Sequence, residues 1–119
     1  MKTTFHCSQR MQTRGITNNM VQFALEFGDI QGDKLFVNRK ILTEELKVLK
    51  SKQTKFQKML KKFKKFKVAT LIAKYLKQLK EIIATANKLL DKGGITVVAV
   101  GDTLLTTYDY SSHKYRNSY

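Results

Sequence analysis

The feature that most constrains this chain is a stretch of fifty residues, 43–92, that contains neither glycine nor proline. Both residues interrupt helices, so a stretch this long without them favours continuous helix. Its apolar side chains recur in steps that are mostly of three and four residues, the spacing of one helix face. They are Leu46, Leu49, Phe56, Leu60, Phe63, Ile72, Leu76, Leu79, Ile83, Ala86 and Leu90. Gly93-Gly94 follows and predicts where the helical region ends.

The same stretch can form one helix or two. A single helix of this length would exceed about 70 Å at 1.5 Å per residue, which is long for a small domain. A helical hairpin bent near residues 61–69 would bury both apolar stripes against each other, although no turn residue marks the bend. Pairing of long helices between two copies, as a homodimer, is an alternative. We favour two helices, with Thr43 as the N-cap of the first and Glu44 and Glu45 in its first turn.

Two shorter helices are predicted before this stretch, at about 6–14 and 18–27. Gly15 follows the first, where a left-handed glycine commonly ends a helix. Thr17 and the two asparagines after it offer side chains that cap the second. Apolar residues then recur at i, i+3, i+4 and i+7 from Met20, which predicts a buried helix face.

Two β-hairpins flank the long helical stretch. They consist of 29–31 with 34–38, and of 95–100 with 103–108. The first turn, Gly32-Asp33, is expected to be type II′ because it opens with glycine. Strict alternation along the last strand predicts that Leu105 and Thr107 share one face, and Leu104, Thr106 and Tyr108 the other.

Together these elements predict an α+β fold, with an N-terminal helical pair and a long central helix or helical hairpin packed on a small antiparallel sheet. A length of 119 residues predicts a single domain, 1–119. Within it we distinguish a lysine-rich helical arm at about 43–92. The polar and aromatic end of the chain, at about 110–119, is expected to be a mobile tail.

Positive charge dominates the composition. Twenty-three basic residues against nine acidic ones give a net charge of +14, which favours RNA or another polyanion as a partner. Stretch 43–92 alone holds fifteen lysines against four acidic residues. A solvated helix face is the simplest interpretation. The functional alternatives are non-specific contact with RNA or DNA and contact with a membrane surface. The candidate nucleic-acid-binding residues are Arg39, Lys40, Lys55, Lys58, Lys61, Lys62 and Lys65.

Several classes of protein are disfavoured. The single Cys7 cannot form an intrachain disulfide, and the two histidines offer no metal-ligand spacing, so neither a metal nor another cofactor is expected. The N-terminus lacks the apolar run of a secretory signal, and no helical stretch is apolar enough to span a bilayer. We therefore expect a cytoplasmic protein.

His6, Arg10 and Arg14 recur at intervals of four residues near the N-terminus. On a helix they fall within about 80° of arc and form one column. An imidazole and two guanidinium groups are suited to holding a phosphate. The same column is equally typical of a solvated basic helix face.

The order of several motifs points to a known family. These motifs are His6-x-x-x-Arg10-Met11-x-x-Arg14-Gly15-Ile16, Leu25-Glu26-Phe27-Gly28-Asp29, Arg39-Lys40, Asp91-Lys92-Gly93-Gly94 and Gly101-Asp102-x-Leu-Leu-Thr-Thr-Tyr108. Over roughly 4–42 and 86–110 the chain resembles the bacterial family called domain of unknown function 4258. Its central helical region looks longer than is usual there, so the lysine-rich part has no counterpart in the family.

The resemblance implies a small α+β domain, distantly similar to the RelE/ParE-like and BrnT-like toxin fold. Several proteins of that fold are metal-independent ribonucleases, so the implied function is a toxin-like RNA-binding module. If it is an enzyme, the reaction is metal-independent endoribonuclease cleavage. His6 would then be the base, Arg10 and Arg14 would hold the phosphate, and Thr106 or Tyr108 would approach from the last strand.

Two alternatives to catalysis stay open at this point. One is a toxin-like module that binds nucleic acid without cleaving it. The other is a structural or partner-binding protein whose basic surface is complemented by an acidic, antitoxin-like protein. In either case His6 would only hydrogen-bond a strand carbonyl and hold its helix on the sheet.

Overall fold

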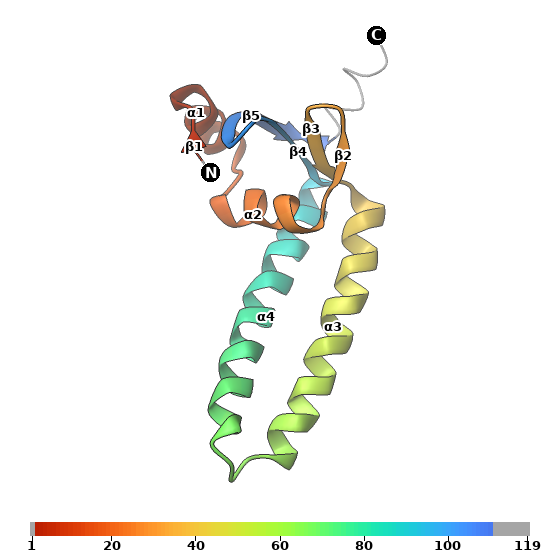
Figure 1. Ribbon diagram of the computed structural model, residues 1–119. Helices are drawn as coiled ribbons and strands as arrows, with labels where there is room; N and C mark the ends of the chain where they lie inside the picture. The colour runs from red at the N-terminus through yellow and green to blue at the C-terminus, as the bar shows by residue number, and fades with distance from the viewer. Residues whose placement is uncertain (1, 111–119) are drawn as a thin grey trace.

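The structure is a computed structural model that describes residues 2–110. Its elements are β1 (Lys2–Thr3), α1 (Phe5–Arg14), α2 (Asn18–Phe27), β2 (Asp29–Gln31), β3 (Lys34–Val37), α3 (Arg39–Lys62), α4 (Val68–Lys92), β4 (Ile95–Val100) and β5 (Thr103–Asp109). The predicted α+β class is confirmed (Figure 1). The predicted mobile tail lies, apart from Tyr110, outside the described residues.

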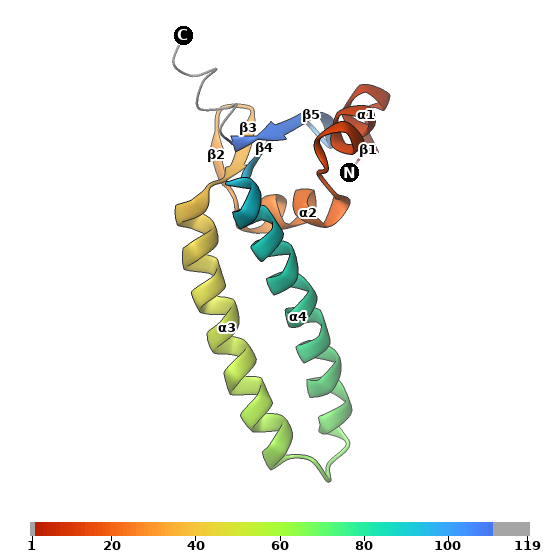
Figure 2. The ribbon, with the colours of Figure 1, turned by 180° about the vertical axis from the view of Figure 1, so that it is seen from behind.

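One mixed sheet has the strand order β1-β5-β4-β3-β2. The four longer strands pair antiparallel, and the short β1 adds to β5 in parallel. α2 packs on α4 and on the sheet, and α1 lies beside β5. α3 and α4 project together from the sheet end, so the molecule measures 58 × 27 × 24 Å (Figures 1 and 2). We call α3, α4 and the connection between them the arm.

The arm is a helical hairpin within one chain, and its bend falls inside the predicted window. α3 ends at Lys62 and α4 begins at Val68. The buried side chains along the seam between the two helices are Leu46, Leu49, Ile72, Leu79 and Ala86. Phe56 of α3 also meets Tyr75 of α4 edge-on, with ring centroids 4.7 Å apart. Each large aliphatic side chain removed from water in this way contributes about 1.5–3 kcal/mol, which explains why the chain folds back without a turn residue.

The predicted start of the first long helix is wrong. α3 begins at Arg39, because the side chain of Asn38 accepts a hydrogen bond from the Ile41 backbone N–H at 2.9 Å and serves as the N-cap. The Thr43 hydroxyl instead donates to the Arg39 carbonyl at 2.7 Å, inside the helix. The two glutamates after Thr43 therefore lie beyond the first turn. Asn38 takes the capping position because it directly follows β3, whose Val37 is paired with β4.

Both hairpins are present, and the first turn agrees with type II′. Gly32 has a φ of +64°, and Gln31 pairs with Lys34 across a two-residue loop. A type I′ turn would need positive φ at Asp33 as well. No non-glycine residue of the described part of the chain has positive φ.

The predicted alternation along β5 is wrong at Leu104. Val98 pairs with Thr106 while the next residue, Ala99, pairs with Leu104, so Leu105 is an extra residue in a β-bulge. The bulge turns Leu104 to the same face as Thr107, where both side chains are buried. Thr106 and Tyr108 remain together on the opposite face.

Gly94 provides a test of how the arm joins the sheet. Its φ is +99°, and a Cβ atom there would overlap the Val37 carbonyl oxygen. We expect Gly94→Ala to lower the free energy of unfolding by about 3 kcal/mol or more, since backbone strain and a steric clash add. Gly32→Ala is the control, because Gly32 also has positive φ but faces open space, and about 1–2 kcal/mol is expected. Urea unfolding followed by circular dichroism measures both, and equal midpoints would contradict this account.

Candidate functional site

Helix α1 lies along the edge of β5, as the catalytic hypothesis required. β1 pairs only with Thr103 and Leu104, so it covers only the start of that edge. Farther along, the Thr4 hydroxyl donates to the Leu105 carbonyl at 3.3 Å, and Nη1 of Arg14 donates to the Thr107 carbonyl at 3.0 Å. These contacts protect a strand edge that would otherwise be free to pair with another chain.

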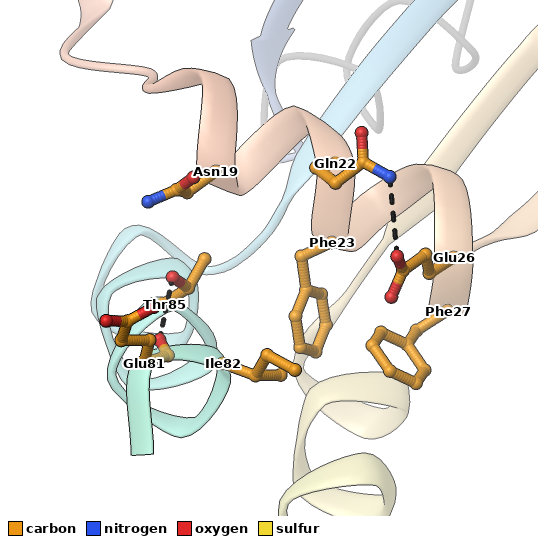
Figure 3. Close-up of a pocket in the computed structure, with 8 residues that line it drawn as sticks. All are labelled: Asn19, Gln22, Phe23, Glu26, Phe27, Glu81, Ile82 and Thr85. Carbon is orange, nitrogen blue, oxygen red and sulfur yellow. Dashed lines mark hydrogen bonds between the residues drawn. The ribbon is translucent and has the colours of Figure 1, made fainter. Parts of the chain in front are cut away.

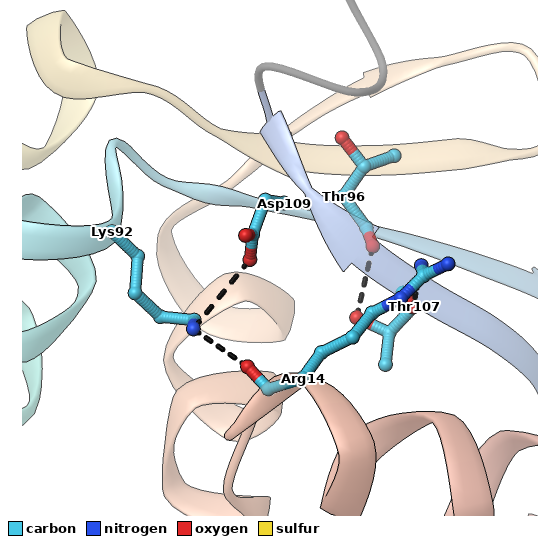
Figure 4. Close-up of polar contacts among 5 residues, drawn as sticks. All are labelled: Arg14, Lys92, Thr96, Thr107 and Asp109. Carbon is cyan, nitrogen blue, oxygen red and sulfur yellow. Dashed lines mark hydrogen bonds and ion pairs between the residues drawn. The ribbon is translucent and has the colours of Figure 1, made fainter.

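Lys92 joins three elements at this edge (Figure 4). Its Nζ donates to the backbone carbonyl of Arg14 at 2.7 Å, at the C-terminus of α1, and lies 3.6 Å from Oδ1 of Asp109 on β5. The last carbonyls of a helix have no partner within the helix, and a cation there also interacts favourably with the helix dipole. Lys92 itself lies in the last turn of α4, so one ammonium group holds α1, α4 and β5 together.

The column of His6, Arg10 and Arg14 does not share one environment. Cys7 and Met11 are buried and mark the side of α1 that faces the core. At about 100° per residue, Arg14 lies about 40° from that direction and His6 about 120° away. Accordingly His6 is exposed, whereas Arg10 and Arg14 are half-buried. The Arg14 guanidinium, held by the Thr107 carbonyl, already has a structural role.

The two predicted residues of β5 lie on the other face of the sheet from Leu104. Thr106 is half-buried, and Tyr108 is only 2% exposed. Met11 of α1 and Leu104 line the same pocket, so α1 meets the Leu104 face. The structure therefore places the α1 backbone beside β5 but does not bring the predicted side chains into one cluster. Their assignment to a catalytic site stays a prediction.

Cys7 and the metal-ligating residue types form no second candidate site within residues 2–110. Burial raises the pKa of the Cys7 thiol above its ordinary value, so the side chain is a neutral thiol at neutral pH and a poor nucleophile. Within residues 2–110, no cluster of three or more histidine, cysteine or acidic side chains is placed to hold a metal ion. In the same range, no helix is long and apolar enough to cross a membrane.

The predicted nucleic-acid-binding residues are all exposed but occupy two separate places. Arg39 and Lys40 lie at the base of the arm, and the Arg39 guanidinium lies beside Gly93 at the C-terminus of α4. Lys61 is about 33 Å farther along α3, at 1.5 Å per residue. The remaining predicted lysines lie in the half of the arm away from the sheet. They are Lys55, Lys58, Lys61, Lys62 and Lys65.

The positive charge extends well beyond residues 55–67, where the sequence alone had located its concentration. Residues 46–80 contain thirteen lysines and no acidic residue, which leaves a net charge of +1 for the rest of the chain. Because the chain folds back between α3 and α4, these residues form about two thirds of the arm, on the side away from the sheet (Figures 1 and 2). We call residues 46–80 the distal arm.

A pocket of about 140 Å³ between α2 and α4 was also not predicted (Figure 3). Phe23, Phe27 and Ile82 form its apolar floor, and the carboxylates of Glu26 and Glu81 lie at its rim. The amide of Gln22 donates to Glu26 at 3.3 Å. Two carboxylates at the rim disfavour a phosphate, so this pocket is separate from any polyanion site.

The three-way contact at Lys92 can be tested without touching the distal arm. Lys92→Met keeps the length of the side chain but removes the ammonium group, and we expect a loss of about 1–2 kcal/mol in the free energy of unfolding. Lys88→Met is the control, because Lys88 is exposed one turn earlier on the same helix. Thermal and urea unfolding compare the two. If they lose stability equally, the contact with Arg14 and Asp109 contributes nothing.

Comparison with known proteins adds no further residue or role to the candidate site. No protein-family model, curated protein or solved structure matches the chain. The resemblance to the family called domain of unknown function 4258 therefore stays a prediction, and the site rests on the geometry and charge described above.

Proposed function

We propose that this protein binds RNA through the phosphate backbone, using the distal arm. The observation that carries the proposal is the run of thirteen lysines without a single carboxylate, gathered by the hairpin into one projecting rod. Lysine is a point charge without the bidentate geometry of arginine, so contact with phosphates rather than reading of bases is expected. The choice of RNA over DNA comes from the toxin-like resemblance.

The charge of the distal arm has no structural benefit that would explain it. Lys47 with Lys50, Lys58 with Lys61 and Lys62, and Lys74 with Lys77 are like-charge neighbours three or four residues apart. Each such pair destabilises a helix by about 0.2–0.5 kcal/mol. A helix face kept only for solubility usually alternates signs. Within residues 2–110, no ion pair joins a distal-arm lysine to a carboxylate, so these charges are available to a partner.

All thirteen lysines of the distal arm are exposed, whereas the seam between α3 and α4 is apolar. A positive rod of this kind meets a polyanion without a groove and without sequence preference. Such binding is typically in the range of about 10⁻⁴–10⁻⁶ M at physiological salt and weakens steeply as salt rises. An acidic, antitoxin-like protein would be complementary to the same charge and would compete with RNA for it.

Matched pairs of lysines test this proposal. Lys58→Gln with Lys61→Gln in the distal arm should weaken binding of a fluorescent single-stranded RNA and lower the slope of log K against log salt by about 1.4. Lys40→Gln with Lys88→Gln, both exposed near the base of the arm, should change the slope much less. Fluorescence anisotropy over a salt series measures both. No binding by wild type at low salt, or equal losses in both double variants, would overturn the proposal.

The position of α1 beside β5 favours RNA cleavage as a second candidate activity. This activity assigns the base to His6, whose exposed side chain is open to substrate, and the phosphate contact to Arg10. The bond from Arg14 to the Thr107 carbonyl and the burial of Tyr108 count against roles for those two side chains.

RNA incubated with excess protein and a chelator tests cleavage. Wild type should degrade it, and His6→Ala should slow degradation by about 100-fold or more, the usual contribution of a general base. Gln9→Ala, an exposed position on the same helix, should leave the rate unchanged. RNA that stays intact with wild type rules out cleavage and leaves the binding proposal standing.

A further inference from the structure

The far end of the arm exposes apolar side chains as well as lysines. Phe66 is 62% exposed, Val68 41% and Leu71 67%. All three lie at the end of the arm farthest from the sheet, in the connection and the first turn of α4 (Figures 1 and 2). We call residues 61–71 the arm tip. Single exposed apolar residues are ordinary on protein surfaces, whereas a group of them at one projecting point indicates a contact surface.

These side chains contribute little to the packing between α3 and α4. Phe66 meets the neighbouring Phe63 edge-on, with ring centroids 5.8 Å apart, but most of its surface is exposed. Ile72 faces the seam and is 5% exposed, and Leu71 lies about 100° around the helix from it. A lysine or glutamate at position 71 would favour the helix as well as leucine does and would be better solvated. The apolar character of Leu71 therefore has no role inside the chain, and the same holds for the exposed part of Phe66.

The arm tip also contains five lysines and no acidic residue. They are Lys61, Lys62, Lys64, Lys65 and Lys67. Phosphate contact with RNA would use the lysines but not Val68 or Leu71, which are aliphatic and cannot stack on bases as aromatic rings do. A partner surface with anionic groups outside and an apolar layer just beneath them would contact both the lysines and the apolar side chains. An anionic lipid bilayer is such a surface.

Charge and shape disfavour two other partners for the arm tip, a second copy of the chain and a segment of another protein. A second copy of the chain would bring another thirteen uncompensated lysines against the first, which is repulsive. An open hollow at this end of the arm is lined by Leu60, Lys61, Lys64, Ala69, Thr70 and Ala73. Phe66, Val68 and Leu71 are not among its lining residues, so these three side chains suit a broad surface better than a helix or strand held in a groove.

We propose that the arm tip docks on membranes that contain anionic lipids. Phe66, Val68 and Leu71 enter the boundary between headgroups and acyl chains, and the tip lysines contact lipid phosphates. The docking is interfacial, in keeping with the absence of a spanning helix within residues 2–110. The sheet would then lie about 36 Å from the bilayer, the length of the 24 residues of α3. This inference does not rest on RNA binding, although RNA and lipid would compete for the shared lysines.

The protein contains no tryptophan, so a single introduced one reports on the arm tip. Phe66→Trp should show a blue-shifted emission on addition of phosphatidylcholine vesicles that contain phosphatidylglycerol, and no shift with phosphatidylcholine alone. Phe5→Trp is the control, because Phe5 is 78% exposed on α1 at the other end of the molecule, and its emission should not move. Equal shifts at both positions, or none at position 66, would overturn the proposal.

Vesicle sedimentation provides the second measurement. Phe66→Ser with Leu71→Ser should reduce binding to anionic vesicles by about tenfold or more, since interfacial binding scales with buried apolar area. The same variant should keep its helical circular dichroism and its RNA affinity. Ile30→Ser with Val100→Ser, two similarly exposed positions on the sheet, should leave vesicle binding unchanged.

RNA binding and dimerisation of the same tip variant, Phe66→Ser with Leu71→Ser, distinguish a membrane from other partners of the arm tip. If the tip variant loses RNA affinity as strongly as vesicle binding, the tip is a nucleic-acid contact and the membrane proposal is wrong. If wild type dimerises and the tip variant does not, the tip pairs with a second copy, and the proposal is again wrong. Vesicle binding without RNA binding would leave this inference intact and remove the proposed function.

Discussion

The apolar seam between α3 and α4 is the interaction on which the shape and the charge of this protein depend. It excludes water along the arm and continues into the core of the sheet end through Leu42, Ala86 and Leu89. Its burial must outweigh the mutual repulsion of thirteen lysines, which water and salt screen because the lysines are exposed. Without the seam there would be neither a projecting arm nor a concentration of charge on it.

The two ends of the arm use lysine differently. At the sheet end, the Lys92 ammonium group contacts the Arg14 carbonyl and Asp109, and these contacts hold α1 and β5 in place. In the distal arm, the thirteen lysines are exposed, and within residues 2–110 none of them forms an ion pair with a carboxylate. The molecule therefore has a sheet end held by specific polar contacts and a distal end whose charge and exposed apolar groups face outward. This division favours the arm over α1 as the main contact surface.

The residues His6, Arg10 and Arg14 are regularly spaced in the sequence, but on α1 they do not share one environment. A spacing of four residues does not match 3.6 residues per turn, so the column drifts from solvent at His6 toward the strand edge at Arg14. Arg14 then bonds to the Thr107 carbonyl. What resembled one phosphate site is an exposed imidazole, a half-buried guanidinium and a structural contact.

The sequence by itself determined the features that neighbouring residues control. The left-handed glycines at 15 and 93, the Gly32 turn and the helix periods follow from local geometry and apolar spacing. The bend near 61–69 was favoured over a single helix, but only the burial of the seam between α3 and α4 decided it. Only the tertiary structure decided between Asn38 and Thr43 as a helix cap, because the end of β3 depends on its pairing with β4. The same is true of the bulge at Leu105, since it is a property of the register between two strands. The number of lysines was evident from the sequence, but their gathering on one rod required the chain to fold back on itself.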